Sequence, residues 1–218
     1  YPNGVSALNG INVKIEQGEF VYIVGQSGAG KSTFIKLMYR EEKPTKGKII
    51  INNKDLSQIK EKEVPFLRRE IGIIFQDFRL LPKLTVYENV AYALEVIEES
   101  PKKIRGRVME VLEEVGLKNK ARFLPHELSG GEQQRVSIAR AIVNNPRIVI
   151  ADEPTGNLDP DTSWGIMKTF EEINSKGTTI IMATHSKEIV NTFKKRVIAI
   201  ENGVIVRDEQ RGEYGYEI

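Results

Sequence analysis

One short motif limits the possible folds of this chain more than any other feature. Residues 25–32 have the sequence Gly-Gln-Ser-Gly-Ala-Gly-Lys-Ser, which satisfies the pattern G-x-x-x-x-G-K-[ST]. The motif follows an apolar run at 20–24 and precedes a helical pattern at 31–40, which is the structural context that it requires. Glycines let the backbone turn tightly so that successive N–H groups face a phosphate, and the sequence therefore predicts a phosphate-binding loop.

Individual residues of this loop have expected roles. Lys31 would bring a point charge to the β- and γ-phosphates of a nucleotide, and the hydroxyl of Ser32 would ligate Mg²⁺. Lys31 is therefore also a candidate catalytic residue. The candidate ATP-binding residues of the segment are Gly25, Gln26, Ser27, Gly28, Ala29, Gly30, Lys31, Ser32 and Thr33. A glycine-rich turn without function is the alternative, and the flanking strand and helix patterns argue against it.

The rest of the sequence alternates strand and helix patterns. Short runs rich in β-branched and apolar residues predict strands at 11–15, 20–24, 48–51, 71–75, 147–151, 178–183, 197–200 and 204–206. Apolar residues at three- and four-residue spacing predict helices at 31–40, 86–97, 102–115, 132–143, 162–175 and 187–194. Several strand patterns are almost wholly apolar, which is typical of parallel strands covered on both faces. The expected fold is an open α/β sheet with helices on both faces.

A helical block interrupts this alternation. Helix patterns follow one another from residue 85 to 123 with no strand pattern between them. We therefore expect a single domain, in which residues 1–84 and 124–218 form a nucleotide-binding core and residues 85–123 an inserted helical subdomain.

Composition narrows the chemistry further. The chain has 32 Lys and Arg against 30 Asp and Glu, far from the basic excess of proteins that bind nucleic acids, so no nucleic-acid partner is expected. With no cysteine and two histidines, disulfides, thiolate chemistry and a three-histidine metal centre are excluded, and any metal should be bound by oxygen. A mean hydropathy of −0.32, no long apolar run and no secretory signal predict a cytoplasmic chain that does not itself cross a membrane.

Two adjacent acids follow the apolar strand pattern at 147–151. At the end of a core strand, Asp152 would hold Mg²⁺ opposite the phosphate loop. Glu153, pointing elsewhere, would orient and deprotonate a water molecule for in-line attack on the γ-phosphate. Alone, two acids at this position would more often form a solvated turn, but the phosphate loop earlier in the chain favours the functional interpretation.

A second candidate anion site lies at residues 128–134, Leu-Ser-Gly-Gly-Glu-Gln-Gln. The helix that follows has no bulky side chain in its first turn, so its free N–H groups and positive end face outward. Ser129 could also be a simple N-cap with glycines in a loop. A second anion site in a chain that already has one requires a second phosphate or a second chain.

Together, in this order, the motifs resemble those of the ATP-binding subunits of ABC transporters. The motifs are the phosphate loop, a glutamine after a strand at Gln76, L-S-G-G-E-Q-Q, the Asp-Glu strand end, Leu158-Asp159 and a lone His185 after another strand. The resemblance covers essentially the whole chain and implies an ABC-type P-loop ATPase that uses ATP and Mg²⁺. It also implies a head-to-tail dimer, in which each ATP lies between the phosphate loop of one copy and Ser129, Gly130 and Gly131 of the other.

The resemblance assigns roles to further residues. It implies that Gln76 is a third ligand of Mg²⁺ and senses the membrane partner, and that His185 contacts the γ-phosphate as a catalytic residue. Asp159 would support the dimer contact near the phosphate loop of the opposite copy. Tyr1 matches the aromatic residue on which the adenine stacks.

Within this family, several stretches resemble the ATPases that act in cell division. These are residues 37–40, 68–82, 207–209 and 212–216. The likeness implies a membrane subunit as partner, through which ATP cycles would control cell-wall hydrolases from the cytoplasmic face of the cell membrane. Phe78, Leu80 and Leu81, just after Gln76, would form an apolar groove that receives a helix of that subunit. Packing of this loop into the core is the alternative.

Two other functions remain open on the sequence. The ATPase of a lipoprotein-releasing or macrolide-exporting ABC complex would carry the same motifs. A soluble chromosome-organising or DNA-repair ATPase of this family would need a very long coiled coil between the phosphate loop and residues 128–134, and no sustained heptads occur there.

Overall fold

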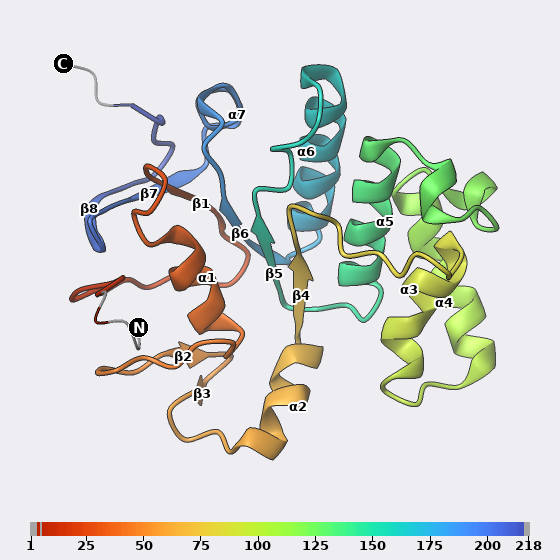
Figure 1. Cartoon of the computed structure of the whole chain (residues 1–218), viewed down its shortest axis with the longest axis horizontal. Coiled ribbons are helices and arrows are strands. Elements are labelled where there is room, and N and C mark those ends of the chain that lie inside the picture. Colours follow the sequence, from red (N-terminus) through yellow and green to blue (C-terminus); the bar gives the residue numbers. More distant parts are fainter. Residues whose placement is uncertain (1–3, 5, 216–218) are drawn as a thin grey trace.

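The computed structural model describes residue 4 and residues 6–215, and a six-stranded sheet lies at their centre (Figure 1). The strands are β1 (Phe20–Val24), β4 (Ile71–Ile74), β5 (Ile148–Asp152), β6 (Thr179–Ala183), β7 (Arg196–Glu201) and β8 (Val204–Glu209). Their spatial order is β4-β5-β6-β1-β7-β8, in which all neighbours are parallel except β8, which is antiparallel to β7. A separate hairpin consists of β2 (Ile50–Ile51) and β3 (Lys54–Asp55).

Helices cover both faces of this sheet, which confirms the predicted α/β fold. They are α1 (Lys31–Met38), α2 (Val64–Arg69), α3 (Val86–Glu95), α4 (Pro101–Glu114), α5 (Gly130–Ile142), α6 (Pro160–Ser175) and α7 (Lys187–Phe193). Short 3₁₀ turns lie at Glu61–Glu63, Lys118–Lys120 and Pro125–Glu127. Among the described residues, no helix combines the length and the apolar character needed to cross a bilayer.

Strand β1 shows why the central strands are apolar throughout. Phe20, Tyr22 and Val24 pack into one core cluster, which also receives side chains from α3, α4, α5, α6 and α7. Val21 and Ile23 alternate with them and pack into a second core cluster with α1 and α2. Because successive side chains of a strand point to opposite faces, a strand covered on both sides has no polar positions left.

The helical block lies at one end of the sheet. Figure 1 shows α3 and α4 beside α5, beyond the edge strand β4. Their buried side chains, such as Val90 and Val108, belong to the same core cluster as residues of β1 and β5. The apolar core is therefore continuous from the sheet into these helices, and the division into a core and an inserted subdomain stays a prediction.

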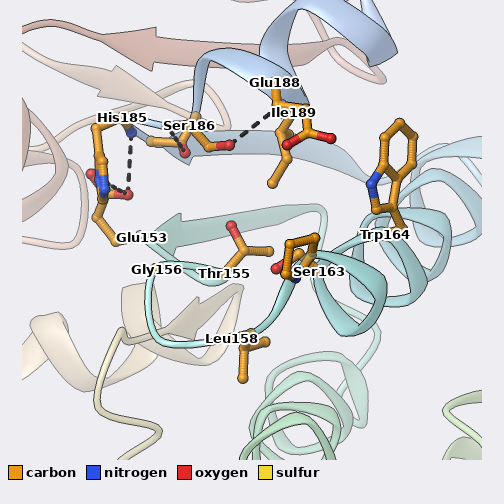
Figure 2. Close-up of a pocket in the computed structure, with 12 residues that line it drawn as sticks. Glu153, Thr155, Gly156, Leu158, Ser163, Trp164, His185, Ser186, Glu188 and Ile189 are labelled. Carbon is orange, nitrogen blue, oxygen red and sulfur yellow. Dashed lines mark hydrogen bonds and ion pairs between the residues drawn. The ribbon is translucent and has the colours of Figure 1, made fainter.

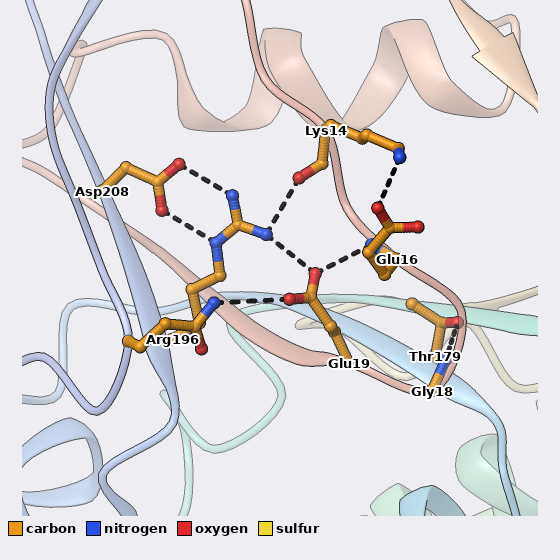
Figure 3. A network of polar contacts seen from close by, with 8 residues as sticks. Lys14, Glu16, Gly18, Glu19, Thr179, Arg196 and Asp208 are labelled. Atoms are coloured by element: carbon orange, nitrogen blue, oxygen red, sulfur yellow. Dashed lines mark hydrogen bonds and ion pairs between the residues drawn. The ribbon is translucent and has the colours of Figure 1, made fainter.

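A polar network fixes the segment that leads into β1 (Figure 3). Arg196 in β7 donates from Nε and Nη2 to the two carboxylate oxygens of Asp208 in β8, at 2.8 and 2.7 Å. Its Nη1 donates to the carboxylate of Glu19 at 2.7 Å and to the carbonyl of Lys14 at 2.9 Å. The hydrogen bonds from Arg196 hold the pKa of the Asp208 carboxyl below its usual range. The network therefore ties the approach to β1 to the far edge of the sheet.

The strand predicted at residues 11–15 is wrong. Ile11, Val13 and Ile15 pack against the second core cluster while the residues between them are exposed, so the expected alternation is present. The segment nevertheless has no strand conformation. The carbonyl of Lys14 accepts a hydrogen bond from the Arg196 side chain instead of a strand neighbour. The alternation here reflects the burial of one face, without pairing in the sheet.

Candidate functional site

The candidate residues follow four neighbouring strands of the sheet. Gln76 comes two residues after β4, Asp152 ends β5, His185 comes two residues after β6, and residues 25–32 follow β1 directly. These four strands are adjacent and parallel in the order β4-β5-β6-β1. Because parallel strands end at the same edge, the structure brings the four motifs together there, as ligand sites of open α/β sheets require.

At two positions of the loop at residues 25–32, the backbone leaves no room for any residue other than glycine. Gly25 has a φ of +150°, and a Cβ added there would lie 2.2 Å from the carbonyl oxygen of Ile200. Gly30 has a φ of +111°, and its Cβ would lie 2.7 Å from the carbonyl oxygen of Ala7. Any side chain at either position would therefore displace backbone, which explains the glycines without reference to a ligand.

The loop ends in an open helix N-terminus. Gly30 is the N-cap of α1 and has no side chain to occupy the first N–H groups of the helix, which remain available to an anion. The ammonium group of Lys31 folds back over the loop and donates to the carbonyls of Gly25 and Gln26, at 2.8 and 3.0 Å. A positive charge and free N–H donors are thus concentrated at one point.

Asp152 and Ser32 lie in contact at this edge. Burial and the neighbouring Glu153 raise the pKa of the Asp152 carboxyl, while Lys31, Lys36 and a hydrogen bond with the Ser32 side chain oppose that rise. A carboxylate and a hydroxyl side by side are hard oxygen ligands of the kind that Mg²⁺ prefers. The residues present therefore fit a magnesium ion.

Glu153 and His185 form a pair that the sequence did not predict (Figure 2). The Oε2 atom of Glu153 accepts a hydrogen bond from the backbone N–H of His185 at 3.2 Å and lies 2.8 Å from its Nδ1. Glu153 has a φ of 48°, and its backbone N–H donates to the carbonyl of Ala183 at 3.0 Å. The Glu153 side chain is 14% exposed and that of His185 64%. The carboxylate is therefore held in one place at the rim of the site.

A cavity of about 230 Å³ opens beside this pair (Figure 2). It lies between the segment that follows β5 and the start of α7, and its lining includes Thr155, Trp164, Ser186 and Glu188. Since a water molecule occupies about 30 Å³ of liquid, several can reach the Glu153 carboxylate from this side.

Gln76 lies against the turn that follows Glu153. Its carbonyl accepts a hydrogen bond from the side chain of Asn157 at 3.3 Å, and its Nε2 would be 3.4 Å from a Cβ added at Gly156. In the described part of the chain, its side chain has no hydrogen bond to Asp152 or Ser32. The structure thus places Gln76 next to the predicted metal ligands without joining it to them.

Ser129 caps helix α5. Its hydroxyl accepts from the N–H of Glu132 at 3.3 Å, and its own N–H donates to the Glu132 carboxylate at 3.0 Å. This reciprocal capping box satisfies one N–H of the first turn. The N–H groups of Gly130 and Gly131, the first two of the helix, have no intrahelical acceptor.

The start of α6 supports this helix end. A Cβ added at Gly131 would lie 2.3 Å from Cγ2 of Thr162, so a larger residue there would have to displace the Thr162 side chain. The carboxylate of Asp159 caps α6 by accepting from the N–H of Thr162 at 3.0 Å, and these hydrogen bonds lower its pKa. Ser129, Gly130 and Asp159 are all exposed. The residues expected to act in trans therefore share one outer surface of the chain.

This surface lies away from the chain's own phosphate loop. Helix α5 packs against β4, whereas the loop leaves the sheet from β1, three strands farther along. With about 4.8 Å between neighbouring strands, β4 and β1 are themselves roughly 14 Å apart. Within the described residues, no hydrogen bond or ion pair joins the loop at 25–32 to Ser129, Gly130 or Gly131. Tyr1, the expected adenine contact, lies outside the described residues.

The expected partner segment is half-buried. Leu80 packs against the first core cluster, so its side chain contributes to the core. Phe78 and Leu81 are also half-buried and, among the described residues, belong to neither core cluster. The backbone of Leu81 is fastened by Asn89, whose side chain bonds both its N–H and its carbonyl, at 2.8 and 3.1 Å. The groove of Phe78, Leu80 and Leu81 stays a prediction, and Phe78 and Leu81 are the two of these side chains that lie outside the core clusters.

Comparison with known sequences identifies relatives that are all ABC-type ATP-binding proteins. A family model described as ABC transporter matches residues 8–156. The chain is 76% identical over 215 residues to the cell division ATP-binding protein FtsE of Bacillus subtilis (strain 168), covering 99% of this chain and 94% of the relative. It is 64% identical over 217 residues to FtsE of Streptococcus pneumoniae serotype 2, covering 100% and 94%.

Solved structures of other ATP-binding cassettes of ABC transporters also match this chain. The dimeric post-hydrolysis structure of the ATP-binding cassette MJ0796, bound to ADP and Pi, matches with a TM-score of 0.85 and 38% identity, covering 96% of this chain and 92% of that one. The structure of cbiO1 from Clostridium perfringens, part of the cbiONQ transporter complex, matches with a TM-score of 0.90 and 35% identity, covering 97% and 84%.

Proposed function

This chain belongs to the ABC transporter family and is an ATPase, and we propose that it hydrolyses ATP with Mg²⁺ at the common edge of β4, β5, β6 and β1. The observation that supports this most strongly is the convergence of four motifs on that edge. Residues 25–32 would hold the phosphates, and the free N–H groups of α1 and the Lys31 ammonium would neutralise their charge.

Three oxygen ligands would hold the metal. The Ser32 hydroxyl lies close enough to Asp152 to lower the pKa of that carboxyl, and Gln76 would complete the set with its amide oxygen. When bound, Mg²⁺ would neutralise charge on the β- and γ-phosphates. The Nε2 atom of Gln76 lies near Gly156, in the turn that follows Glu153, so this side chain is at the same edge of the sheet as the other two ligands.

Glu153 would act as the general base. Its Oε2 is held by the backbone N–H and Nδ1 of His185, which leaves the other carboxylate oxygen to accept a proton from an attacking water. The cavity beside it would supply that water. In its protonated form, in which both ring nitrogens donate, His185 would also contact the γ-phosphate with its second ring nitrogen, so that one residue orients both the base and the group that is attacked.

Two copies would share each ATP. In the part of the chain that the structure describes, no hydrogen bond or ion pair joins the loop at 25–32 to the same chain's Ser129, Gly130 or Gly131. We propose that Ser129, Gly130 and Gly131 of a second copy approach it head to tail, with Asp159 supporting the contact. The family member MJ0796 has been solved as a dimer bound to ADP and Pi, which supports this arrangement.

The partner would be the membrane subunit FtsX. The relatives at 76% and 64% identity are named cell division ATP-binding protein, and the likeness extends over nearly their full length. We propose that the chain associates with FtsX at the cytoplasmic face of the cell membrane, where ATP cycles would control cell-wall hydrolases. Purification of the full-length protein from membranes should recover FtsX with it; recovery of a lipoprotein or macrolide exporter subunit instead would contradict this.

Docking of FtsX can be tested at Leu81. We expect Leu81→Asp to fold, because its side chain lies outside both core clusters, and to lose most of its copurification with FtsX, because an apolar groove would then hold an unpaired carboxylate. Leu80→Asp is the comparison, since it should unfold the chain by placing a charge against the core. Full recovery of FtsX with folded Leu81→Asp would place the docking surface elsewhere.

A further inference from the structure

Arg140, in the last turn of α5, has a set of contacts that the roles assigned above do not use. Its Nη1 donates to the carbonyl of Arg79 at 2.7 Å and its Nη2 to the carbonyl of Phe78 at 2.8 Å. Burial lowers the pKa of its guanidinium, and within the described residues it has no carboxylate partner. A cation withdrawn from water is costly unless it is hydrogen-bonded, so these two carbonyls are what hold it in place.

The two carbonyls belong to a strained turn. Phe78 and Arg79 have φ values of 57° and 46°, the left-handed region that residues with a side chain rarely occupy, and here two follow in succession. The N–H of Arg79 bonds the carbonyl of Asp77 at 2.6 Å, and the N–H of Phe78 bonds that of Phe75 at 3.2 Å. Such a turn persists only where its surroundings hold it, and Arg140 bonds both of its carbonyls.

Side chains from elsewhere in the fold hold both ends of the same segment. The carbonyl of Gln76 accepts from Asn157 at 3.3 Å. At the far end, the fully buried Asn89 donates to the carbonyls of Leu84 and Thr85 at 2.9 and 3.0 Å, besides its two bonds to Leu81. Residues 76–85 are therefore fastened at the ends by two amides and in the middle by Arg140.

We propose that Arg140 is a positioning residue for ATP hydrolysis: by clamping the turn at Phe78 and Arg79 it fixes the direction from which Gln76 approaches the metal site. The inference rests on the proposed role of Gln76 as a ligand of Mg²⁺. Helix α5 begins at the exposed cap formed by Ser129, which would contact the ATP bound to the second copy. Residues 76–85 would contact the ATP bound to this copy. Arg140 therefore connects the elements that would contact the two ATP molecules.

Only arginine can make this clamp. The planar guanidinium presents parallel N–H groups that match two neighbouring carbonyls, whereas a lysine ammonium at the same place is a point charge on a flexible stem. Methionine fills similar volume and donates nothing. Arg140→Met should therefore release the turn, and Arg140→Lys should restore part of the lost function.

Arg107 offers a matched control. It lies in α4 and donates from Nε to the carbonyl of Val143 at 3.1 Å and from Nη2 to that of Ile142 at 3.4 Å, at the end of the same helix α5. Like Arg140 it is a partly buried arginine that binds backbone carbonyls, but it does not touch residues 76–85. Arg107 also pairs with Glu110 at 3.0 Å and Glu114 at 3.6 Å, so Arg107→Met removes at least as many contacts at the end of α5 without releasing the turn.

Three measurements on the purified chain test the clamp: hydrogen–deuterium exchange of residues 76–85, the Mg²⁺ concentration for half-maximal hydrolysis, and ATP affinity in EDTA. We expect Arg140→Met to speed exchange in this segment and to raise the half-maximal Mg²⁺ concentration by about tenfold, as loss of a supporting contact does at metal sites. ATP affinity in EDTA should stay unchanged, Arg140→Lys should be intermediate, and Arg107→Met should leave both Mg²⁺ dependence and exchange at 76–85 unaltered.

Other results would overturn the proposal. It is wrong if Arg140→Met and Arg107→Met behave alike, if Mg²⁺ dependence is unchanged in a folded Arg140→Met, or if neither Arg140 variant folds, since the arginine would then be purely structural. Gln76→Ala serves as the reference for the metal role. If that variant leaves Mg²⁺ dependence unaltered, the proposed role of Gln76 fails, and the exchange data still decide whether Arg140 holds the turn.

Discussion

Lys31→Ala is expected to lower the rate of ATP hydrolysis by about a hundredfold to a thousandfold, the usual loss when one preorganised charged donor is removed from a reacting group. Lys31 lies at the start of α1 with its ammonium over the loop that would hold the phosphates. Alanine leaves the glycine turn and the helix N-terminus in place but removes the charge. Steady-state phosphate release at saturating ATP measures the loss.

Lys176→Ala is a suitable control for this variant. Lys176 pairs with Glu114 at 2.8 Å on the surface, just after the carboxyl end of α6. Its removal takes away the same charge without touching the site, so hydrolysis should stay at the parent rate. Equal turnover by Lys31→Ala and the parent would contradict the assignment of residues 25–32 as the phosphate site.

Glu153→Gln is expected to keep ATP binding and to lose hydrolysis by about a hundredfold to ten-thousandfold, the usual contribution of a general base. The amide has nearly the shape of the carboxylate and can still accept the hydrogen bond from the His185 N–H, but it cannot take a proton from water. Nucleotide titration and phosphate release separate the two effects. ATP-bound dimers should accumulate, visible as a doubled mass in light scattering.

Glu188→Gln is the matched control, because Glu188 lines the same cavity but, among the described residues, takes no part in the ion pair between Glu153 and His185. Its hydrolysis should be close to that of the parent. An undiminished rate of ATP hydrolysis in Glu153→Gln would exclude Glu153 as the base. An equal loss in both variants would show that the rate depends on the negative charge of the cavity and not on proton transfer to Glu153.

The sequence predicted the central sheet well because its strands are buried on both faces. Almost wholly apolar runs, such as those of β5 and β6, leave few alternatives, and the motifs at their ends locate the site. The sequence failed at residues 11–15, where alternation reflects packing on the core without strand pairing. Periodicity cannot distinguish these two cases.

Smaller elements were missed for different reasons. Helix α2 has only six residues, too few to show a helical period, and it went unpredicted. The hairpin of β2 and β3 has a sequence signal that was not used. Its turn consists of Asn52 and Asn53, which have φ values of 49° and 63°, and asparagine is one of the residues that tolerate such positive φ values. The sequence predicted only a strand at 48–51 in its place.

Contacts between residues far apart in the chain could not be predicted from the sequence. The motifs assigned separate roles to Glu153 and His185, which are 32 positions apart, and nothing in the spacing shows that one holds the other. Arg140 bonds carbonyls 61 and 62 positions away, and carbonyl acceptors leave no mark on the sequence. Leu80 was predicted to line a groove, and its half-buried side chain packs against the first core cluster. A short apolar run in a loop does not show which of its side chains face the core.

The most direct test of the shared ATP site is to mix two inactive variants. Lys31→Ala removes the charge of the phosphate loop, and Ser129→Arg blocks the exposed cap of α5 with a bulky side chain. In a head-to-tail dimer of one copy of each, both lesions fall on one site and the other site is intact. Random pairing should therefore restore about a quarter of the parent activity, since half of the dimers are mixed and each has one working site. A mixture as inactive as its components, or a fully active Ser129→Arg, would contradict the account.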